Sequence, residues 1–165
     1  MNGGVCFRNS RGGLLKIGEH ALLQMRGYVQ DDRGKAEAGG VLLGRFVLGT
    51  ADVVVDQVTV PMPGDRRSRR CFFRDARPHQ AVIDRRWSQS RHRCNYLGGW
   101  HTHPEPIPTP SGTDTRDWKR ALQRNQFDSE TLYFVIVGTQ EVRAWEGDRH
   151  THQIEELVPI VDREG

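Results

Sequence analysis

The chain has 165 residues, 36% of them hydrophobic, and its 24 Lys and Arg against 21 Asp and Glu give a formal net charge of +3. Counting the 18 glycines as well brings the apolar fraction into the ordinary globular range, which excludes a disordered or collagen-like chain. The length predicts one domain over residues 1–165, built around a single hydrophobic core.

The sequence favours a cytoplasmic protein with no membrane partner. Its longest apolar run, residues 132–138, is far shorter than the ~20 residues of a membrane-spanning helix. Residues 1–4 lack the charged-then-apolar layout of a signal peptide. The three cysteines, Cys6, Cys71 and Cys94, are odd in number and widely spaced, so we expect free thiols.

The first half of the chain predicts one helix and several strands. Ala21, Leu22, Met25 and Val29 have the spacing of one helix face, so we expect a helix over residues 18–30. Runs of aliphatic and β-branched residues predict strands at 14–17, 41–48, 53–60 and 71–74. A basic loop with proline and glycine, residues 61–70, separates the last two strands.

The second half of the chain predicts two further helices and several strands. Pro78 suits the first turn of a helix that runs to Trp87, because proline there loses no hydrogen bond. A third helix is expected at 113–124, after a proline-rich loop. Further strands are predicted at 96–103, 132–138, 142–146 and 153–160. The expected fold class is α/β (α+β), a mixed β-sheet flanked by helices. Core positions are expected at Trp87, Val135, Ile136, Val137 and Trp145.

The positive charge is mostly arginine and is concentrated in one region. The cluster comprises Arg66, Arg67, Arg69, Arg70, Arg74 and Arg77. Guanidinium groups bind carboxylates and phosphates bidentately, so the cluster could recognise an acidic partner. A solvated loop and strand edge explains it equally simply. The net charge is modest, so we do not expect nucleic acid as the partner.

The strongest chemical signal lies in residues 98–104 and 110–114. Alternate side chains of a strand point the same way, so His101 and His103 share one face and can reach one metal ion. Asp114 follows a loop, in the first turn of the expected third helix, where its carboxylate can join them. Two His and one Asp leave a fourth tetrahedral position for water, as in a catalytic zinc site. Zinc would lower the pKa of that water toward ~7.

Simpler explanations exist for these residues taken singly. A His-x-His pair is common on strands, and Ser111-Gly112-Thr113-Asp114 matches a variant of the helix capping box. A capping box does not explain why this motif follows His-Thr-His-Pro. A second pair, His150 and His152 with Asp162, lacks that context, so we expect it to be a polar strand start. His20, His79 and His92 have no ligand-like neighbours in the sequence.

A carboxylate earlier in the chain completes the candidate site. Glu37 precedes Gly39 and Gly40, which open an apolar strand and permit close backbone approach. From the mouth of that strand Glu37 could reach a metal-bound water and act as a general base. Taken alone, Glu37 would equally suit an exposed loop.

Together these residues resemble the JAMM (JAB1/MPN/Mov34) metalloprotease family. The family pattern is a glutamate before a Gly-Gly strand, then His-Ser/Thr-His-Pro, then Pro-Ser-x-x-Asp, and the chain matches every position. The resemblance covers roughly residues 15–160 and implies an MPN/JAB-like fold with cytidine-deaminase-like layering. It also implies one zinc ion per chain bound by His101, His103 and Asp114, Glu37 as acid and base, and Ser111 steadying the oxyanion.

A narrower resemblance is carried by residues outside these motifs. Arg69 to Asp75, Gly98, Trp100, Glu105 and Trp118 are similar to positions in the stand-alone bacterial JAB peptidases of CBASS anti-phage operons. Those enzymes are deubiquitinase-like partners of an E1–E2 fusion, and they release the operon's nucleotidyltransferase (CD-NTase) from proteins joined to its C-terminus. The resemblance therefore implies a zinc isopeptidase that cleaves after the C-terminal tail of a ubiquitin-like or conjugated protein. Such a tail could add a strand to a sheet edge.

Three alternatives stay open. The chain could be a non-catalytic MPN-type scaffold, although such scaffolds usually have lost ligands that are all present here. It could be a JAB hydrolase of another bacterial ubiquitin-like or sulfur-carrier pathway. The pI near 9.0 and the arginine run leave a nucleic-acid-associated protein as the third.

Overall fold

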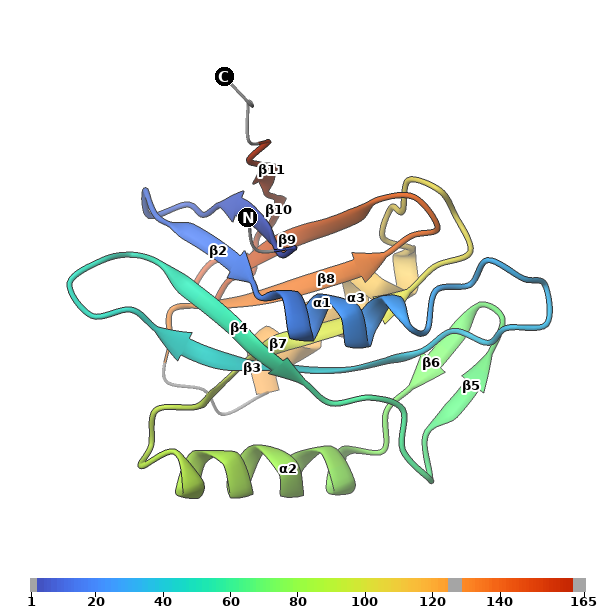
Figure 1. Ribbon diagram of the computed structural model, residues 1–165, viewed down its shortest axis with the longest axis horizontal. Helices are drawn as coiled ribbons and strands as arrows, with labels where there is room; N and C mark the ends of the chain where they lie inside the picture. Colours follow the sequence, from blue (N-terminus) through green and yellow to red (C-terminus); the bar gives the residue numbers. More distant parts are fainter. Residues whose placement is uncertain (1–2, 125–128, 162–165) are drawn as a thin grey trace.

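The computed structural model describes residues 3–124 and 129–161, which form one large sheet, a small hairpin and three helices. The sheet contains β1 (Val5–Arg8), β2 (Leu14–Ile17), β3 (Gly39–Phe46), β4 (Val53–Val58), β7 (Asn95–Thr102), β8 (Thr131–Val137), β9 (Val142–Asp148), β10 (Ile154–Glu156) and β11 (Val158–Pro159). The hairpin is β5 (Arg66–Ser68) with β6 (Cys71–Phe73), and the helices are α1 (Glu19–Arg26), α2 (Ala76–Gln89) and α3 (Gly112–Arg124). A mixed sheet with flanking helices confirms the predicted fold class (Figure 1).

The sheet carries a hydrophobic core on each face. Its strand order is β10-β9-β8-β7-β3-β4-β2-β1-β11, with β2/β4 and β7/β8 parallel and the other pairs antiparallel. Every residue of β8 is buried, because its side chains alternate between the two cores. Val135 belongs to the core beneath α1, and Phe134 to the core beneath α3. β7 therefore runs through the middle of the molecule, with packed layers on both sides.

The two edges of the sheet are joined by the C-terminal segment. β10 pairs with β9 at one edge and β11 pairs with β1 at the other, yet only Leu157 separates β10 from β11. Leu157 is buried, and its N–H donates to the carbonyl of Ala144 on β9. The prediction of one continuous strand over 153–160 is therefore wrong. Two short strands close the curved sheet instead, and Pro159 lies at an edge, where a missing N–H is tolerated.

Other differences from the predicted elements have local causes. β1 and β5 were not expected; β5 consists of exposed polar residues and is defined only by its pairing with β6. α1 ends at Arg26 rather than at residue 30; Gly27 is its C-cap, and the Gly27 N–H donates to the carbonyl of Leu23. β3 begins two residues earlier than predicted, at Gly39.

The predicted core is confirmed except at one tryptophan. Val135, Ile136, Val137 and Trp145 are buried. Trp87 is only half-buried on α2, where its ring stacks on His92 with the centroids 4.7 Å apart. Across residues 3–124 and 129–161, no helix has the length and apolar character needed to cross a membrane. All three cysteines are free thiols, as expected.

Candidate metal centre

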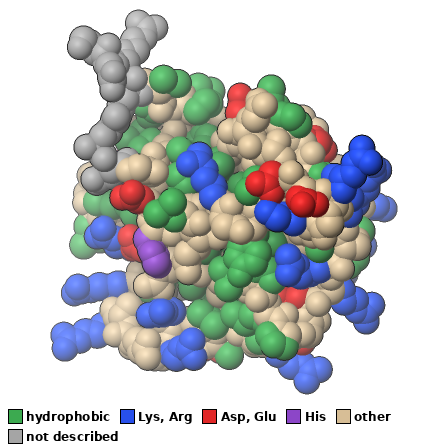
Figure 2. All heavy atoms as spheres, turned by 45° about the vertical axis from the view of Figure 1, so that its right-hand side comes forward, with side chains coloured by type: hydrophobic (Ala, Val, Ile, Leu, Met, Phe, Trp, Pro, Cys, Tyr) green, Lys and Arg blue, Asp and Glu red, His purple; other side chains and the backbone are tan. Residues whose placement is uncertain are grey.

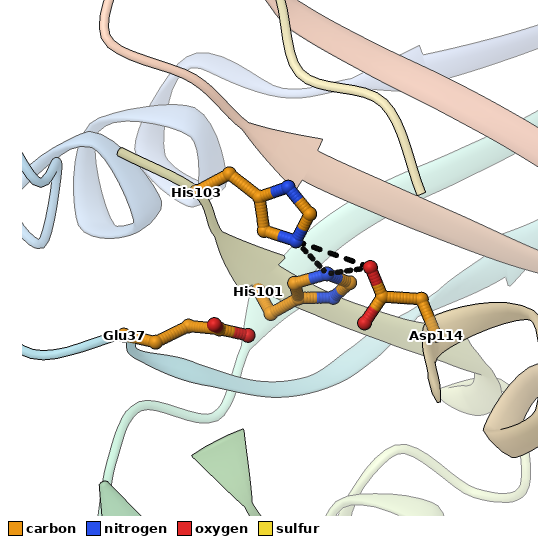
Figure 3. A group of neighbouring side chains, drawn as sticks. All are labelled: Glu37, His101, His103 and Asp114. Carbon is orange, nitrogen blue, oxygen red and sulfur yellow. Dashed lines mark hydrogen bonds and ion pairs between the residues drawn. The ribbon is translucent and has the colours of Figure 1, made fainter. Parts of the chain in front are cut away.

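Four polar side chains from separate parts of the chain meet at one end of β7 (Figure 3). His101 lies on β7 and His103 just beyond it, Asp114 lies in the first turn of α3, and Glu37 lies in the loop before β3. Their ligating atoms all lie within 4.8 Å of one another. The sequence predicts these four residues as one site, and the structure brings them together.

The pairing of β3 with β7 places Glu37 beside the histidines. Gly39 lies opposite His101 in the antiparallel ladder, so the residue two positions before Gly39 reaches the level of His103. A Cβ atom at Gly39 would lie 2.5 Å from the carbonyl oxygen of Trp100, and one at Gly40 would lie 2.1 Å from the carbonyl oxygen of Thr59. The two glycines are required because neighbouring backbones leave no room for a side chain.

Three of the ligating atoms form a nearly regular triangle. Nε2 of His101 lies 3.1 Å from Nε2 of His103, and Oδ2 of Asp114 lies 3.2 Å and 3.1 Å from these two nitrogens. A tetrahedral zinc ion with bonds of about 2.0–2.1 Å separates neighbouring ligand atoms by about 3.3 Å. Two imidazoles and one carboxylate are also ligand types that zinc accepts. The three residues therefore fit a single zinc ion.

The other ring nitrogen of His103 faces a second acid. Nδ1 is buried and has no hydrogen-bond partner among the described residues, and Oε1 of Glu105 lies 3.6 Å away. When Nε2 gives its lone pair to a metal ion, Nδ1 carries the proton, and the Glu105 carboxylate favours that arrangement. In the sequence, Glu105 is marked only by the narrower resemblance to the bacterial JAB peptidases, which does not predict this contact with His103.

Asp114 and Ser111 form the capping box that the sequence allowed. The Asp114 N–H donates to Oγ of Ser111 over 3.0 Å, and the Ser111 N–H donates to Oδ2 of Asp114 over 2.9 Å. The same Oδ2 atom faces both histidines, so capping and ligation do not exclude each other. Burial opposes ionisation, but hydrogen bonds from His101 and His103 hold the pKa of Asp114 far below its usual range. Asp114 is therefore an anion at neutral pH.

Glu37 is buried and its backbone is fixed from both sides. Its N–H donates to the carbonyl of Ser68 over 2.7 Å, and Nε of Arg67 donates to the Glu37 carbonyl over 3.0 Å. Burial raises the pKa of the Glu37 carboxyl to about 7, although charge on the nearby histidines opposes this. A carboxyl group with such a pKa can both accept and donate a proton near neutral pH.

A buried chain of polar side chains holds the loop that carries Glu37. Gln30 donates from Nε2 to the carbonyls of Lys35 and Arg69, and its Oε1 accepts from the hydroxyl of Thr102 on β7. The Thr102 oxygen in turn accepts from the N–H of Ala38 over 2.9 Å. Gln30 is only 2% exposed, and no motif in the sequence signals its role.

A second buried network supports the strands behind the site. Oγ1 of Thr59 accepts from the N–H of Val41, and lies 2.6 Å from Nδ1 of His79. Nε2 of His79 lies 2.9 Å from Oδ2 of Asp65. Because an ionised Asp65 carboxylate can only accept, Nε2 of His79 is the donor in that pair, and in the neutral ring Nδ1 then accepts from the Thr59 hydroxyl. No partner of His79 is predicted from the sequence; in the structure His79 joins α2 to Thr59, just after β4, and to Asp65 in the loop that follows.

The second His-x-His pair lies outside the metal centre. His150 contacts Glu130 and lies in the turn after β9, before β10 begins. His152 has a φ angle of 57°. Asp162 lies outside the described residues. The strand start predicted at this pair is a turn.

The arginine cluster has more than one role. Arg67 and Arg69 hold the β5–β6 hairpin against the loop that carries Glu37, through the carbonyls of Glu37 and Asp32. Arg74 lines the cavity beside the metal centre. Figure 2 shows Lys and Arg side chains spread over one face rather than gathered in a stripe. That distribution does not favour the nucleic-acid alternative.

The metal centre opens on a cavity of about 500 Å³. Glu37, His101 and Asp114 lie on its wall, and the aromatic rings of Phe72 and Trp118 also line it. The ring of Trp118 lies 6.2 Å from that of His101, centroid to centroid. The cavity can therefore bring the chain of a substrate to the reacting groups.

Known proteins match this chain in sequence and fold. A model of prokaryotic homologs of the JAB domain matches residues 19–148. A Pseudomonas aeruginosa protein named CD-NTase/cGAS isopeptidase is 40% identical over 76% of this chain and 77% of its own. A Vibrio cholerae protein of the same name is 31% identical over 91% of each chain. A solution structure of a Desulfitobacterium hafniense protein has a TM-score of 0.60 at 21% identity, covering 85% of this chain and 87% of its own, and so shares the fold.

The family match includes the whole candidate metal centre. The matched residues include Glu37, both histidines and Asp114, together with the strands and helices that carry them. The chain belongs to the family of prokaryotic homologs of the JAB domain.

Proposed function

We propose that the chain is a zinc-dependent isopeptidase that hydrolyses the amide bond after the C-terminal tail of a conjugated or ubiquitin-like protein. The observation that carries the proposal is the meeting of Glu37, His101, His103 and Asp114 beside a cavity of about 500 Å³. The names of the two isopeptidase relatives support a CD-NTase as the conjugated protein. CBASS anti-phage defence would be its setting, with an E1–E2 fusion as the enzyme that forms the conjugate.

Each residue of the site has its own role in the proposed hydrolysis. A zinc ion held by His101, His103 and Asp114 would polarise the scissile carbonyl and lower the pKa of a water toward ~7. Glu37 accepts a proton from the water as the water oxygen bonds to the carbonyl carbon. It then passes that proton to the amine nitrogen as the C–N bond breaks, which leaves a carboxylic acid and an amine. The second proton of the water then moves from the acid to the amine, so the products are a carboxylate and an ammonium group. The Ser111 hydroxyl donates to the carbonyl oxygen while that atom carries negative charge.

The proposal includes the setting in which the enzyme works. Residues 1–165 act as one domain, since one sheet carries or adjoins all four side chains of the metal centre. The three free cysteines suit a reducing cytoplasm. A scaffold without activity is not favoured, because each residue that the reaction needs is in place.

A Glu37→Gln variant tests the proposal. The substrate is a CD-NTase whose C-terminus is joined to a reporter protein, and release of the reporter is followed with the parent and the variant. We expect the variant to keep the parent's zinc content and to lose at least about 10³-fold in rate, because only the proton transfer is removed. A scaffold would release no reporter in either form. Release by the variant at the parent's rate would show that Glu37 is not the acid and base.

A further inference from the structure

The cavity beside the metal centre is one part of a longer groove. A second cavity, of about 390 Å³, adjoins it and is bordered by Gln80 and Ile83 of α2. Four residues line both cavities: Arg74, Ala76, Tyr96 and Arg124. The groove therefore runs from His101 over β7, with α2 on one side and α3 on the other.

The floor of the groove is open at Gly99. A Cβ atom built there would meet nothing closer than the carbonyl oxygen of Gly40 at 3.4 Å, with Nη1 of Arg74 next at 3.7 Å. Unlike Gly39 and Gly40, this glycine is not imposed by packing. Its missing side chain leaves the Arg74 guanidinium directly over the backbone of β7.

Three arginines line the groove: Arg74, Arg120 and Arg124. Arg120 lines the first cavity and forms an ion pair with Asp117, 3.8 Å away. Within residues 3–124 and 129–161, Arg74 and Arg124 form no ion pair with any carboxylate. Both side chains are exposed, so their charge is available to a ligand. A guanidinium group binds a carboxylate through two parallel hydrogen bonds, which gives it selectivity for Asp and Glu.

We infer that this groove binds an extended segment of the substrate through an acidic side chain that pairs with Arg74. This rests on the proposed function, which places the scissile amide at His101. Gly99 lies two residues before His101 on β7, and a strand rises about 3.3 Å per residue, so the two residues are about 7 Å apart along the strand. Nη1 of Arg74 lies beside the Gly99 position. An extended substrate has the same rise. The Asp or Glu therefore lies two to four residues from the bond that is cleaved, and Arg124 flanks the continuation of that segment.

Peptide binding tests the inference without relying on hydrolysis. The probes are fluorescein-labelled alanine-rich hexapeptide amides with Glu at the second, third or fourth position from the amide, each matched by a peptide with Gln. Their affinity for the zinc-loaded Glu37→Gln variant is measured by fluorescence anisotropy. We expect at least one Glu peptide to bind about 10-fold more tightly than its Gln counterpart.

Three substitutions test whether Arg74 causes the preference for Glu peptides: two lie in the groove and one lies outside it. Arg74→Gln, added to Glu37→Gln, should reduce the preference to less than about 2-fold. Gly99→Glu should do the same, because its carboxylate has room and pairs with Arg74. Arg85→Gln, at an exposed position of α2 outside both cavities, should keep the full preference. Equal binding of Glu and Gln peptides, binding of none at about 1 mM, or a preference that survives Arg74→Gln would overturn the inference.

The same peptides, as aminocoumarin amides, separate the two proposals. With the parent protein we expect kcat/KM to follow the binding preference. If the Glu peptides bind selectively but none is hydrolysed, the groove assignment holds and the hydrolase assignment fails. If all the peptides are bound equally and hydrolysed at equal rates, the hydrolase assignment holds and the groove assignment fails.

Discussion

Single residues of the metal centre serve the fold and the proposed chemistry at once. Asp114 closes the first turn of α3 with Ser111 and also directs Oδ2 at both histidines. The sequence poses capping and ligation as alternatives, but the structure combines them, because the N-terminus of α3 is the place where the chain returns to β7. His101 and His103 could be placed from strand periodicity alone. The role of Gln30 could not be predicted, since Arg69 and Thr102 lie in segments that only the fold brings near. Glu105 lies only two residues from His103, but no sequence pattern indicates that its carboxylate faces Nδ1.

Ser111→Ala separates the two roles of Ser111. The loss of the cap should lower the free energy of unfolding by about 1 kcal/mol. If Ser111 also donates to the oxyanion, kcat should fall by about 10²-fold while the zinc content stays that of the parent. Ser111→Thr keeps a hydroxyl and should restore most of both quantities. A kcat equal to the parent's in Ser111→Ala would limit this residue to capping.

At the scale of elements, buried polar networks fix the segments that surround the centre. Thr59, His79 and Asp65 tie α2 to β4, and Gln30 with Thr102 ties the Glu37 loop to β7. The apolar strands β3 and β8 were predicted to within two residues, because a short continuous aliphatic run is typical of a buried strand. The β5–β6 hairpin was only half predicted: β5 has no apolar pattern and is held by its partner strand and by Arg67 and Arg69.

The Asp65–His79 contact should make stability depend on acid pH. Burial opposes ionisation of Asp65, but hydrogen bonds from the N–H groups of Met62 and Asp75 and from His79 outweigh it and lower the pKa of Asp65. Its contribution is therefore complete above the ordinary carboxyl pKa of ~3.9 and is lost as the pH falls through the lower value of the folded state.

Asp65→Asn removes that charge. Urea unfolding at pH 5 should give a free energy of unfolding about 2 kcal/mol below that of the parent. This difference should shrink as the pH falls below about 4. The exposed Asp84→Asn in α2 should leave stability within about 0.5 kcal/mol at both pH values. A difference that stays constant on acidification would contradict the assigned linkage.

At the scale of the whole molecule, the closed sheet keeps the distant parts of the site in register. β3 and β7 lie mid-sheet and carry the metal-centre residues or lead into them, while the C-terminal segment joins the outer strands β9 and β1. The residue pattern at 153–160 gives no sign of this division, because no turn residue such as Gly or Asn separates the two pieces. The break at Leu157 follows from the strand pairing in the structure, where β10 pairs with β9 and β11 pairs with β1.

Leu157→Ala tests this closure. Removing a side chain that is only 6% exposed should cost about 3 kcal/mol in the free energy of unfolding. The neighbouring Val158→Ala, at a position 63% exposed, should change it by less than about 0.5 kcal/mol. Chemical denaturation of the three proteins gives both numbers. Equal effects of the two substitutions would mean that Leu157 does not join the core as described.

The central claim is that two imidazoles and one carboxylate bind one zinc ion beside Glu37. The most direct test is the metal content of protein purified without added zinc, measured by inductively coupled plasma mass spectrometry. We predict about one zinc per chain for the parent and for Glu37→Gln, and less than about one tenth of that for a His101→Ala/His103→Ala double variant. Full zinc content in the double variant, or no zinc in the parent even after incubation with the ion, would contradict the account.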